Sequence, residues 1–257
     1  MNEAADRDVV IAFVGPPHRI DDGISQLLKS LRDIGFDHYY QAQLTGWVLY
    51  VEDSTDLAIL QTFARTLRHE AQVFLERPFV HYVATNLPQR AREHFYGLRE
   101  AKSDLVGIAI FDRLDKELQS GTALKEIMWR RREIENYFCS RDVLLAYARH
   151  DLPDDLFGKA EHDKRAKAMT EAIDEVTDAL ITLGKPDPWS ADIKATDDFL
   201  DPVFRVFFKK FDLPLGLRKS DYHLLAGLVP KQGIDSEVVQ KLDAIAAVAS
   251  TARPRGS

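Results

Sequence analysis

Residues 46–67 read GWVLYVEDSTDLAILQTFARTL, and this stretch decides the fold. Its first part, residues 46–51, is continuously apolar, which is typical of a strand buried on both faces of a parallel sheet. Ser54 is a good helix N-cap, and apolar residues recur at helical spacing from Leu57 to Leu67. The stretch therefore predicts a strand, a tight turn and a helix, with the acidic residue Glu52 at the carboxyl end of the strand.

The same alternation continues along the chain. We expect further strands at Phe79–Ala84, Leu105–Phe111 and Leu124–Trp129, and a helix at Pro88–Glu100. The strand at 105–111 is again apolar throughout and is followed by Asp112. Strands that alternate with helices predict an α/β fold in which helices cover both faces of a parallel sheet. In such a sheet, functional residues gather at the carboxyl ends of the strands.

The remaining segments suggest a division of the chain into a core and additions to it. We expect a leading segment over 1–45, with a strand at Val9–Val14 and a helix at Asp22–Ile34, then the core over 46–150. An acidic helical subdomain follows over 151–212, with helices at Lys159–Leu183 and Thr196–Phe211. The chain then returns to the core over 213–250, with a helix at Ser236–Ala247, and ends in a disordered tail over 251–257.

The charge of the chain is spread unevenly. Residues 151–201 hold fourteen acidic and six basic residues, a net charge of −8, whereas all 257 residues together carry −7. The rest of the chain is therefore nearly neutral, at +1. A polyanionic partner is tolerable there, although the total charge alone argues against one.

Composition excludes several classes of protein. No apolar run approaches the roughly 20 residues that a membrane span needs, and the start MNEAADRD lacks the features of a secretory signal. We therefore expect a cytoplasmic protein with no membrane partner. The single cysteine, Cys139, cannot form an internal disulfide. With no second cysteine and no His-x-His or His-x-x-x-His spacing, we expect no zinc site, so that any metal should be bound by oxygen.

Acidic residues gather where the predicted strands end. They are Glu52 and Asp56, then Asp112 and Asp115, then Glu133 and Glu135. Taken singly, each is explained by helix capping or turn chemistry. Brought to one sheet edge, they would repel one another and raise one another's pKa unless a cation neutralised them. The group therefore indicates a site for hard divalent cations such as Mg²⁺, and two such ions about 4 Å apart can cleave a phosphodiester in line.

Three of these segments resemble the acidic motifs of the Toprim domain in overcoming-lysogenization-defect (OLD) family nucleases. They are LYVEDSTD at 49–56, GIAIFDRLD at 107–115 and REIENYF at 132–138. A later segment, LRKSDYHLL at 217–225, is similar to the lysine-bearing segment of those enzymes. The resemblance covers the chain from about residue 46 to about residue 247.

The resemblance implies a Toprim fold, which is a Rossmann-like parallel sheet flanked by helices, here with a helical insertion. It further implies an endonuclease that hydrolyses DNA with two Mg²⁺ or Mn²⁺ ions. Glu52 and Asp56 would hold one ion, and Asp112 would hold the other or bridge both. Glu133 and Glu135 would complete the shell or position water.

The resemblance also assigns Lys219, and two positions depart from the family pattern. Lys219 would stabilise charge on the phosphate in the transition state, a task that suits a cation. Asp53 stands where the family usually has glycine after the first glutamate. Leu114 takes the place of the second aspartate of an Asp-x-Asp pair, so Asp115 would have to reach the second ion from one residue further along. The alternative is a catalytically weakened Toprim module that works as a binding or assembly domain beside an ABC-type ATPase.

Partners follow from the same resemblance. DNA is the expected substrate, and a homodimer would suit the cleavage of both strands. The family joins this domain to an ATPase, whose phosphate loop needs Gly-x-x-x-x-Gly-Lys-Ser/Thr. That motif is absent from the sequence. We therefore expect either an ATPase domain upstream in the same polypeptide, which we favour, or a standalone relative of the family, and in both cases no ATP binding by these residues.

Overall fold

The computed structural model describes residues 34–119, 121, 123–150, 153 and 155–255, apart from the side chains of 156 and 157, and the backbone of two short strands. These strands, β1 (Ile11–Ala12) and β2 (His18–Arg19), pair antiparallel. Of the predicted strand at Val9–Val14 and the predicted helix at Asp22–Ile34, only Ile11, Ala12 and Ile34 are among the described residues.

Strands and helices alternate through the first half of the described chain, as the sequence predicts. The strands are β3 (Trp47–Val51), β4 (Val80–Tyr82), β5 (Val106–Phe111) and β6 (Leu124–Met128). The helices around them are α2 (Phe36–Thr45), α3 (Ser54–Leu67), α4 (Ala71–Leu75), α5 (Pro88–Arg99) and α10 (Ser236–Ala249).

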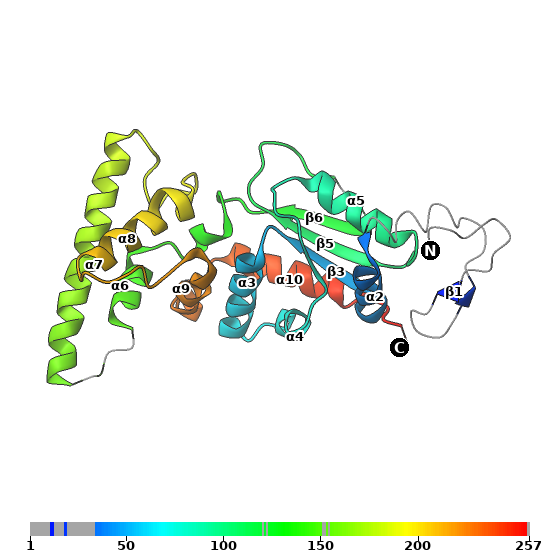
Figure 1. Cartoon of the computed structure of the whole chain (residues 1–257), viewed down its shortest axis with the longest axis horizontal. Coiled ribbons are helices and arrows are strands. Elements are labelled where there is room, and N and C mark those ends of the chain that lie inside the picture. The colour runs from blue at the N-terminus through cyan, green and yellow to red at the C-terminus, as the bar shows by residue number, and fades with distance from the viewer. Residues whose placement is uncertain are drawn as a thin grey trace.

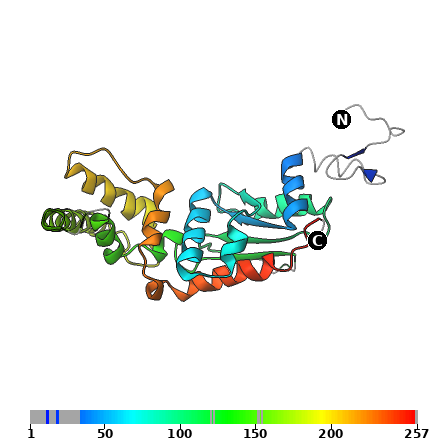
Figure 2. The ribbon, with the colours of Figure 1, turned by 90° about the horizontal axis from the view of Figure 1, so that it is seen from below.

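The four strands form one parallel sheet in the order β4-β3-β5-β6, which confirms the predicted α/β fold and its Rossmann-like parallel sheet flanked by helices. Every residue of β3 is buried, because both faces of the sheet are covered. Trp47, Leu49 and Val51 face the layer that contains α3, α4 and α10. Val48 and Tyr50 face the opposite layer, made by α2 and α5 (Figures 1 and 2).

The turn after β3 is held by two carboxylates. Asp53 is the N-cap of α3, and its Oδ1 accepts a hydrogen bond from the backbone N of Thr55 at 2.6 Å. Asp56 Oδ2 accepts from the backbone N of Glu52 at 2.9 Å and of Asp53 at 3.4 Å. This capping box differs from the predicted Ser54 cap, since Ser54 is already the first helical residue.

The remaining helices gather beyond the carboxyl ends of the strands, at one end of an elongated molecule (Figure 1). They are α6 (Arg141–Arg149), α7 (Leu156–Thr182), α8 (Asp201–Lys209) and α9 (His223–Gly227), with a π-helical turn η2 (Ala195–Leu200) and short 3-10 turns η1 (Ile134–Tyr137), η3 (Lys219–Asp221) and η4 (Lys231–Gly233). The helix predicted at Thr196–Phe211 is therefore two pieces, η2 and α8, and Pro202 lies in the first turn of α8, where its missing N–H costs little. Every helix in the described part of the chain is too short or too polar to cross a membrane.

The end of the described chain packs against the start of β3. Lys102 Nζ donates a hydrogen bond to the carbonyl O of Arg253 at 2.9 Å, and the backbone N of Arg255 donates to Gln43 O at 2.9 Å. Gly46 has φ 71°, and a Cβ placed there would lie 2.7 Å from backbone atoms of Arg253. Residues 251–255 therefore have defined partners, in contrast to the disordered tail that the sequence predicts from 251.

Candidate functional site

Five of the six predicted acidic ligands lie at the carboxyl edge of the sheet. Glu52 follows β3, Asp56 lies in the first turn of α3, Asp112 follows β5, and Glu133 and Glu135 lie at η1 beyond β6. The strands are parallel, so their carboxyl ends meet at one edge and bring these side chains toward one another. We call these five residues the carboxylate cluster.

Asp112 shows how strongly the members of the cluster act on one another. Burial raises the pKa of Asp112 to about 8, and the negative charges of Asp56, Glu52 and Glu133 and a side-chain hydrogen bond with Glu52 add to this effect. Burial also raises the pKa of Asp56 to about 7, with a contribution from the charge of Asp53. Two carboxyl groups that are at least half protonated at neutral pH without a cation are a natural result of crowding several acids in one buried place.

Glu135 is the most deeply buried member of the cluster. Its side chain is 2% exposed, and its Oε1 has no hydrogen-bond partner among the described residues. Burial raises the pKa of Glu135 well above its ordinary value, and the charges of Glu133 and Asp56 raise it further. A buried carboxylate oxygen without a partner is costly, and a bound cation would supply that partner.

Hydrogen bonds join the third acidic motif to the helical end of the molecule, the group of helices beyond the carboxyl ends of the strands. Glu133 Oε1 accepts a hydrogen bond from the backbone N of Thr196 in η2. Asn136 Oδ1 accepts from the backbone N of Glu133 at 2.9 Å, while its Nδ2 donates to the carbonyl oxygens of Ser190 at 3.3 Å and Ile193 at 3.2 Å. The helical end therefore sets the position of Glu133 through backbone contacts.

Lys219 lies beside the cluster and is paired with Asp53. Its Nζ is 3.1 Å from Asp53 Oδ2, and both side chains are about 40% exposed, at 41% and 40%. Burial alone would lower the pKa of Lys219, but the carboxylates of Glu135 and Asp53 outweigh it and hold the pKa above its ordinary value. Lys219 is therefore a stable cation at the edge of the cluster. Asp53, the departure from the family pattern, occupies one of its hydrogen-bonding positions.

Asp115 is the sixth predicted ligand, and the structure does not bring it into the cluster. It is exposed in the loop after β5, and its charge is not among the largest causes of the raised pKa of Asp112. The neighbouring Leu114 packs against the layer made by α2 and α5, and its backbone N donates to Met128 Sδ at 3.5 Å. The chain between Asp112 and Asp115 therefore turns away from the other carboxylates.

The spacing within the carboxylate cluster limits how a cation could be held. In the described part of the chain, no three of these carboxylates offer oxygens that all lie within 4.8 Å of one another. Mg²⁺ usually keeps several waters and binds through one or two carboxylates directly. The donor chemistry of the cluster and the unpartnered Glu135 Oε1 thus fit a hydrated hard cation, held partly through water.

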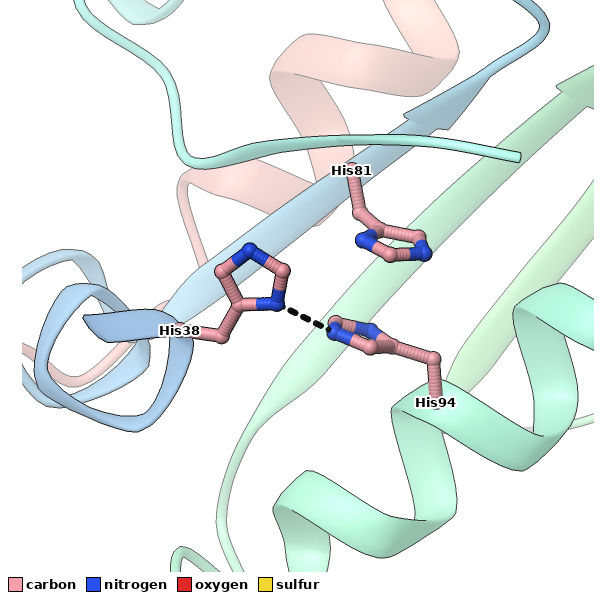
Figure 3. A group of neighbouring side chains, drawn as sticks. All are labelled: His38, His81 and His94. Carbon is pink, nitrogen blue, oxygen red and sulfur yellow. Dashed lines mark hydrogen bonds between the residues drawn. The ribbon is translucent and has the colours of Figure 1, made fainter. Parts of the chain in front are cut away.

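A different group of ligand atoms comes together on the sheet face covered by α2 and α5. His38 of α2, His81 of β4 and His94 of α5 each offer a ring nitrogen, and these nitrogens all lie within 4.8 Å of one another (Figure 3). His38 Nδ1 is 2.9 Å from His94 Nε2, and the rings of His81 and His94 stack with centroids 3.7 Å apart. We call these residues the histidine cluster.

The sequence spacings, from which we expect only oxygen ligands, give no sign of this group of nitrogen atoms. Spacing motifs detect ligands that share one helix or one loop, whereas the members of the histidine cluster come from three elements that meet only in the fold. Burial lowers the pKa of His81 to about 4 and that of His94 to about 3, with further lowering by the neighbouring imidazoles. Both rings are consequently neutral at neutral pH, the form in which imidazole binds metals.

Comparisons with known proteins add nothing to these geometric findings. No protein-family model matches the chain, and a search of curated proteins finds no match either.

Proposed function

We propose that the carboxylate cluster binds Mg²⁺ or Mn²⁺ and that this protein is a metal-dependent endonuclease of the Toprim type that hydrolyses DNA phosphodiesters. The observation that carries the proposal is the unpartnered, buried Oε1 of Glu135 beside Asp112, whose pKa is raised to about 8. A cation would relieve both. The three acidic motifs that resemble those of OLD family nucleases supply these same residues, which supports the choice of chemistry.

Each residue of the edge has a role in this proposal. Bound divalent ions would lower the pKa of an attacking water and stabilise the leaving oxygen. Glu52 and Asp112, the residues directly after β3 and β5, would hold and orient the ions. Asp56, in the first turn of α3, would be a further ligand. Glu135 would contribute its free oxygen, and Lys219 would place a positive charge where the phosphate gains negative charge.

DNA is the proposed substrate, because a phosphodiester polyanion suits both the ions and the neighbouring cations. Arg132 is exposed immediately before Glu133 and adds positive charge at this edge. The acidic surplus of the chain lies in 151–201, which follows the last strand in the sequence and reaches the third acidic motif through residues 190–196. Binding through phosphates alone would make cleavage nearly independent of sequence and sensitive to salt.

Cleavage of supercoiled plasmid in the presence of Mg²⁺ or Mn²⁺ tests the proposal. Wild-type protein is expected to nick the plasmid, and Glu52→Ala and Glu135→Gln are each expected to abolish nicking. Glu76→Gln is the matched control, since Glu76 is an exposed acid at the end of α4. Equal nicking by wild type and Glu52→Ala would assign the activity to a contaminant and contradict the proposal.

A catalytically weakened module that binds or assembles beside an ATPase is the second candidate. Two observations favour it, namely that Asp115 is exposed outside the cluster and that Lys219 is already paired with Asp53. The outcome that identifies this candidate is Mn²⁺ binding without plasmid cleavage by the wild-type protein. An upstream ATPase domain is proposed in either case, and a homodimer is proposed with the nuclease. The ATPase domain rests on the resemblance, and the homodimer rests on the need to cut both strands of a duplex.

A further inference from the structure

We propose that His38, His81 and His94 form a second metal site, one that binds a divalent transition-metal ion of the Zn²⁺ class. This site is separate from the carboxylate cluster, because it lies between α2, β4 and α5 on one face of the sheet rather than at the carboxyl edge. Its ligands are nitrogen atoms, so it also differs from the cluster in chemistry.

The three histidine rings converge on one small region of the fold. In Figure 3, the three rings point from separate elements into one small region, with His38 directed at the edge of His94 and His81 above it. Their nearest ligand atoms lie within 4.8 Å of one another. Neither ring nitrogen of His81 has a hydrogen-bond partner among the residues that the structure describes. His81 therefore offers a lone pair that no protein group in the described chain uses.

A buried hydroxyl group orients the ring of His94. The hydroxyl of Tyr50, a fully buried residue of β3, lies 2.8 Å from His94 Nδ1. Metal-binding histidines usually donate their second ring N–H to an oxygen of a carboxylate, a backbone carbonyl or water, which fixes the tautomer and turns the other nitrogen toward the metal. The Tyr50 hydroxyl oxygen can take that role for His94. With Nδ1–H donating to Tyr50, the lone pair on His94 Nε2 faces His38 Nδ1.

The donor set selects the class of ion. Neutral imidazole suits Zn²⁺, Cu²⁺ and Ni²⁺, whereas Mg²⁺ and Mn²⁺ prefer carboxylate, carbonyl and water oxygens. Three histidines leave a fourth tetrahedral position for water. With zinc–nitrogen bonds of about 2.0–2.1 Å, tetrahedral ligand atoms stand about 3.3 Å apart, so His38 Nδ1 and His94 Nε2, now 2.9 Å apart, need only a small separation. The stacked His81 ring must also tilt.

Binding at this site would hold α2 against the sheet. α2 has no side-chain N-cap bond, and only Tyr39 and Ala42 of its ten residues are buried. An ion shared by His38, His81 and His94 would tie this weakly anchored helix to the edge strand and to α5. Because the ion would bind the folded chain far better than the unfolded one, it would raise the melting temperature in a concentration-dependent way.

Calorimetric titration of chelator-treated protein with Zn²⁺ tests the proposal. Wild type is expected to bind one ion at this site with micromolar or tighter affinity, and the melting temperature is expected to rise. His81→Gln is expected to weaken that binding by about 100-fold or more, and Tyr50→Phe by about 10-fold or more through loss of the orienting hydroxyl. His38→Gln serves as an independent ligand variant, since His38 is also only partly buried.

Two controls keep the result unambiguous. His69→Gln removes a histidine outside the cluster, one that lies 3.0 Å from Asp243, and should leave zinc binding unchanged. Glu135→Gln should also leave it unchanged, so failure of the nuclease proposal and failure of this one can be told apart. The proposal is overturned if wild type takes up no Zn²⁺ at micromolar concentrations. It is overturned equally if His81→Gln and His38→Gln, shown by circular dichroism to be folded, bind the ion as wild type does.

Discussion

Glu135 is buried, and its Oε1 has no hydrogen-bond partner in the described part of the chain, so its substitution tests the proposed cation directly. We expect Glu135→Gln to raise the free energy of unfolding of metal-free protein by about 1–3 kcal/mol, because an uncharged amide replaces an acidic group whose ionised form is disfavoured by burial and by the charges of Glu133 and Asp56. The same variant should lose Mn²⁺ binding. Urea unfolding in chelator and Mn²⁺ titration measure the two effects. A variant less stable than wild type would show that Oε1 has a favourable partner in the folded state.

Substitution of Lys219 distinguishes a role in the reaction from a role in stability. Its ion pair with Asp53 is exposed, and such pairs contribute about 0–1 kcal/mol. Lys219→Met should therefore change stability by less than about 1 kcal/mol while lowering plasmid cleavage at least about 10-fold through loss of charge stabilisation. Lys231→Met, which removes an exposed lysine of η4, is the matched control. If both variants cleave equally well, Lys219 has no part in the reaction.

Single residues also mark how far sequence reasoning reaches. Glu52 and Asp112 were predictable as neighbours, because each directly follows a strand and parallel strands end at one edge. Asp115 was expected beside them, but the sequence carries no signal that Leu114 packs into the layer of α2 and α5 and turns the loop away. His81 and His94 share no local motif, so only their three-dimensional meeting could reveal the histidine cluster.

At the scale of elements, prediction succeeded where the pattern was dictated by burial on both faces. The apolar runs of β3 and β5 leave no alternative to central strands. By contrast, the sequence does not predict α2, which lies within the leading segment over 1–45. Its sequence, FDHYYQAQLT, has no continuous apolar stripe, and only two of its residues are buried in the structure. The sequence predicts an ordinary helix over the π-helical turn η2, because a π-helix differs from an α-helix mainly in hydrogen-bond register.

The junction between β3 and the preceding helix provides a prediction for an element. Gly46 has a positive φ, and a Cβ there would approach the backbone of Arg253 to 2.7 Å. Gly46→Ala should therefore destabilise the protein by about 2 kcal/mol or more, through backbone strain and displacement of the docked segment. Gly184→Ala is the matched control, because Gly184 has φ 64° with open space around its Cβ position, and should lose only about 1 kcal/mol. Equal losses in thermal unfolding would show that the contact with Arg253 is unimportant.

The whole molecule combines two proposed metal sites of opposite chemistry. We expect Mn²⁺ and Zn²⁺ to raise the melting temperature additively, because the carboxylate and histidine clusters have no residue in common and their ions prefer different donors. Differential scanning fluorimetry with each ion and with both measures this. Glu135→Gln should remove only the Mn²⁺ effect and His81→Gln only the Zn²⁺ effect. Competition between the ions in wild type would mean that they share a site.

The docking of residues 253–255 beside Gly46 also shows where this protein can be attached to a surface. That contact lies at the amino ends of the strands, whereas Glu52 and Asp112 lie at their carboxyl ends (Figure 1). A biotin group coupled after Arg255 would attach the molecule to a glass surface on the side where the strands begin. Individual DNA duplexes stretched in flow would then meet the acidic edge without the support in the way, and single cleavage events could be timed by the loss of a tethered bead.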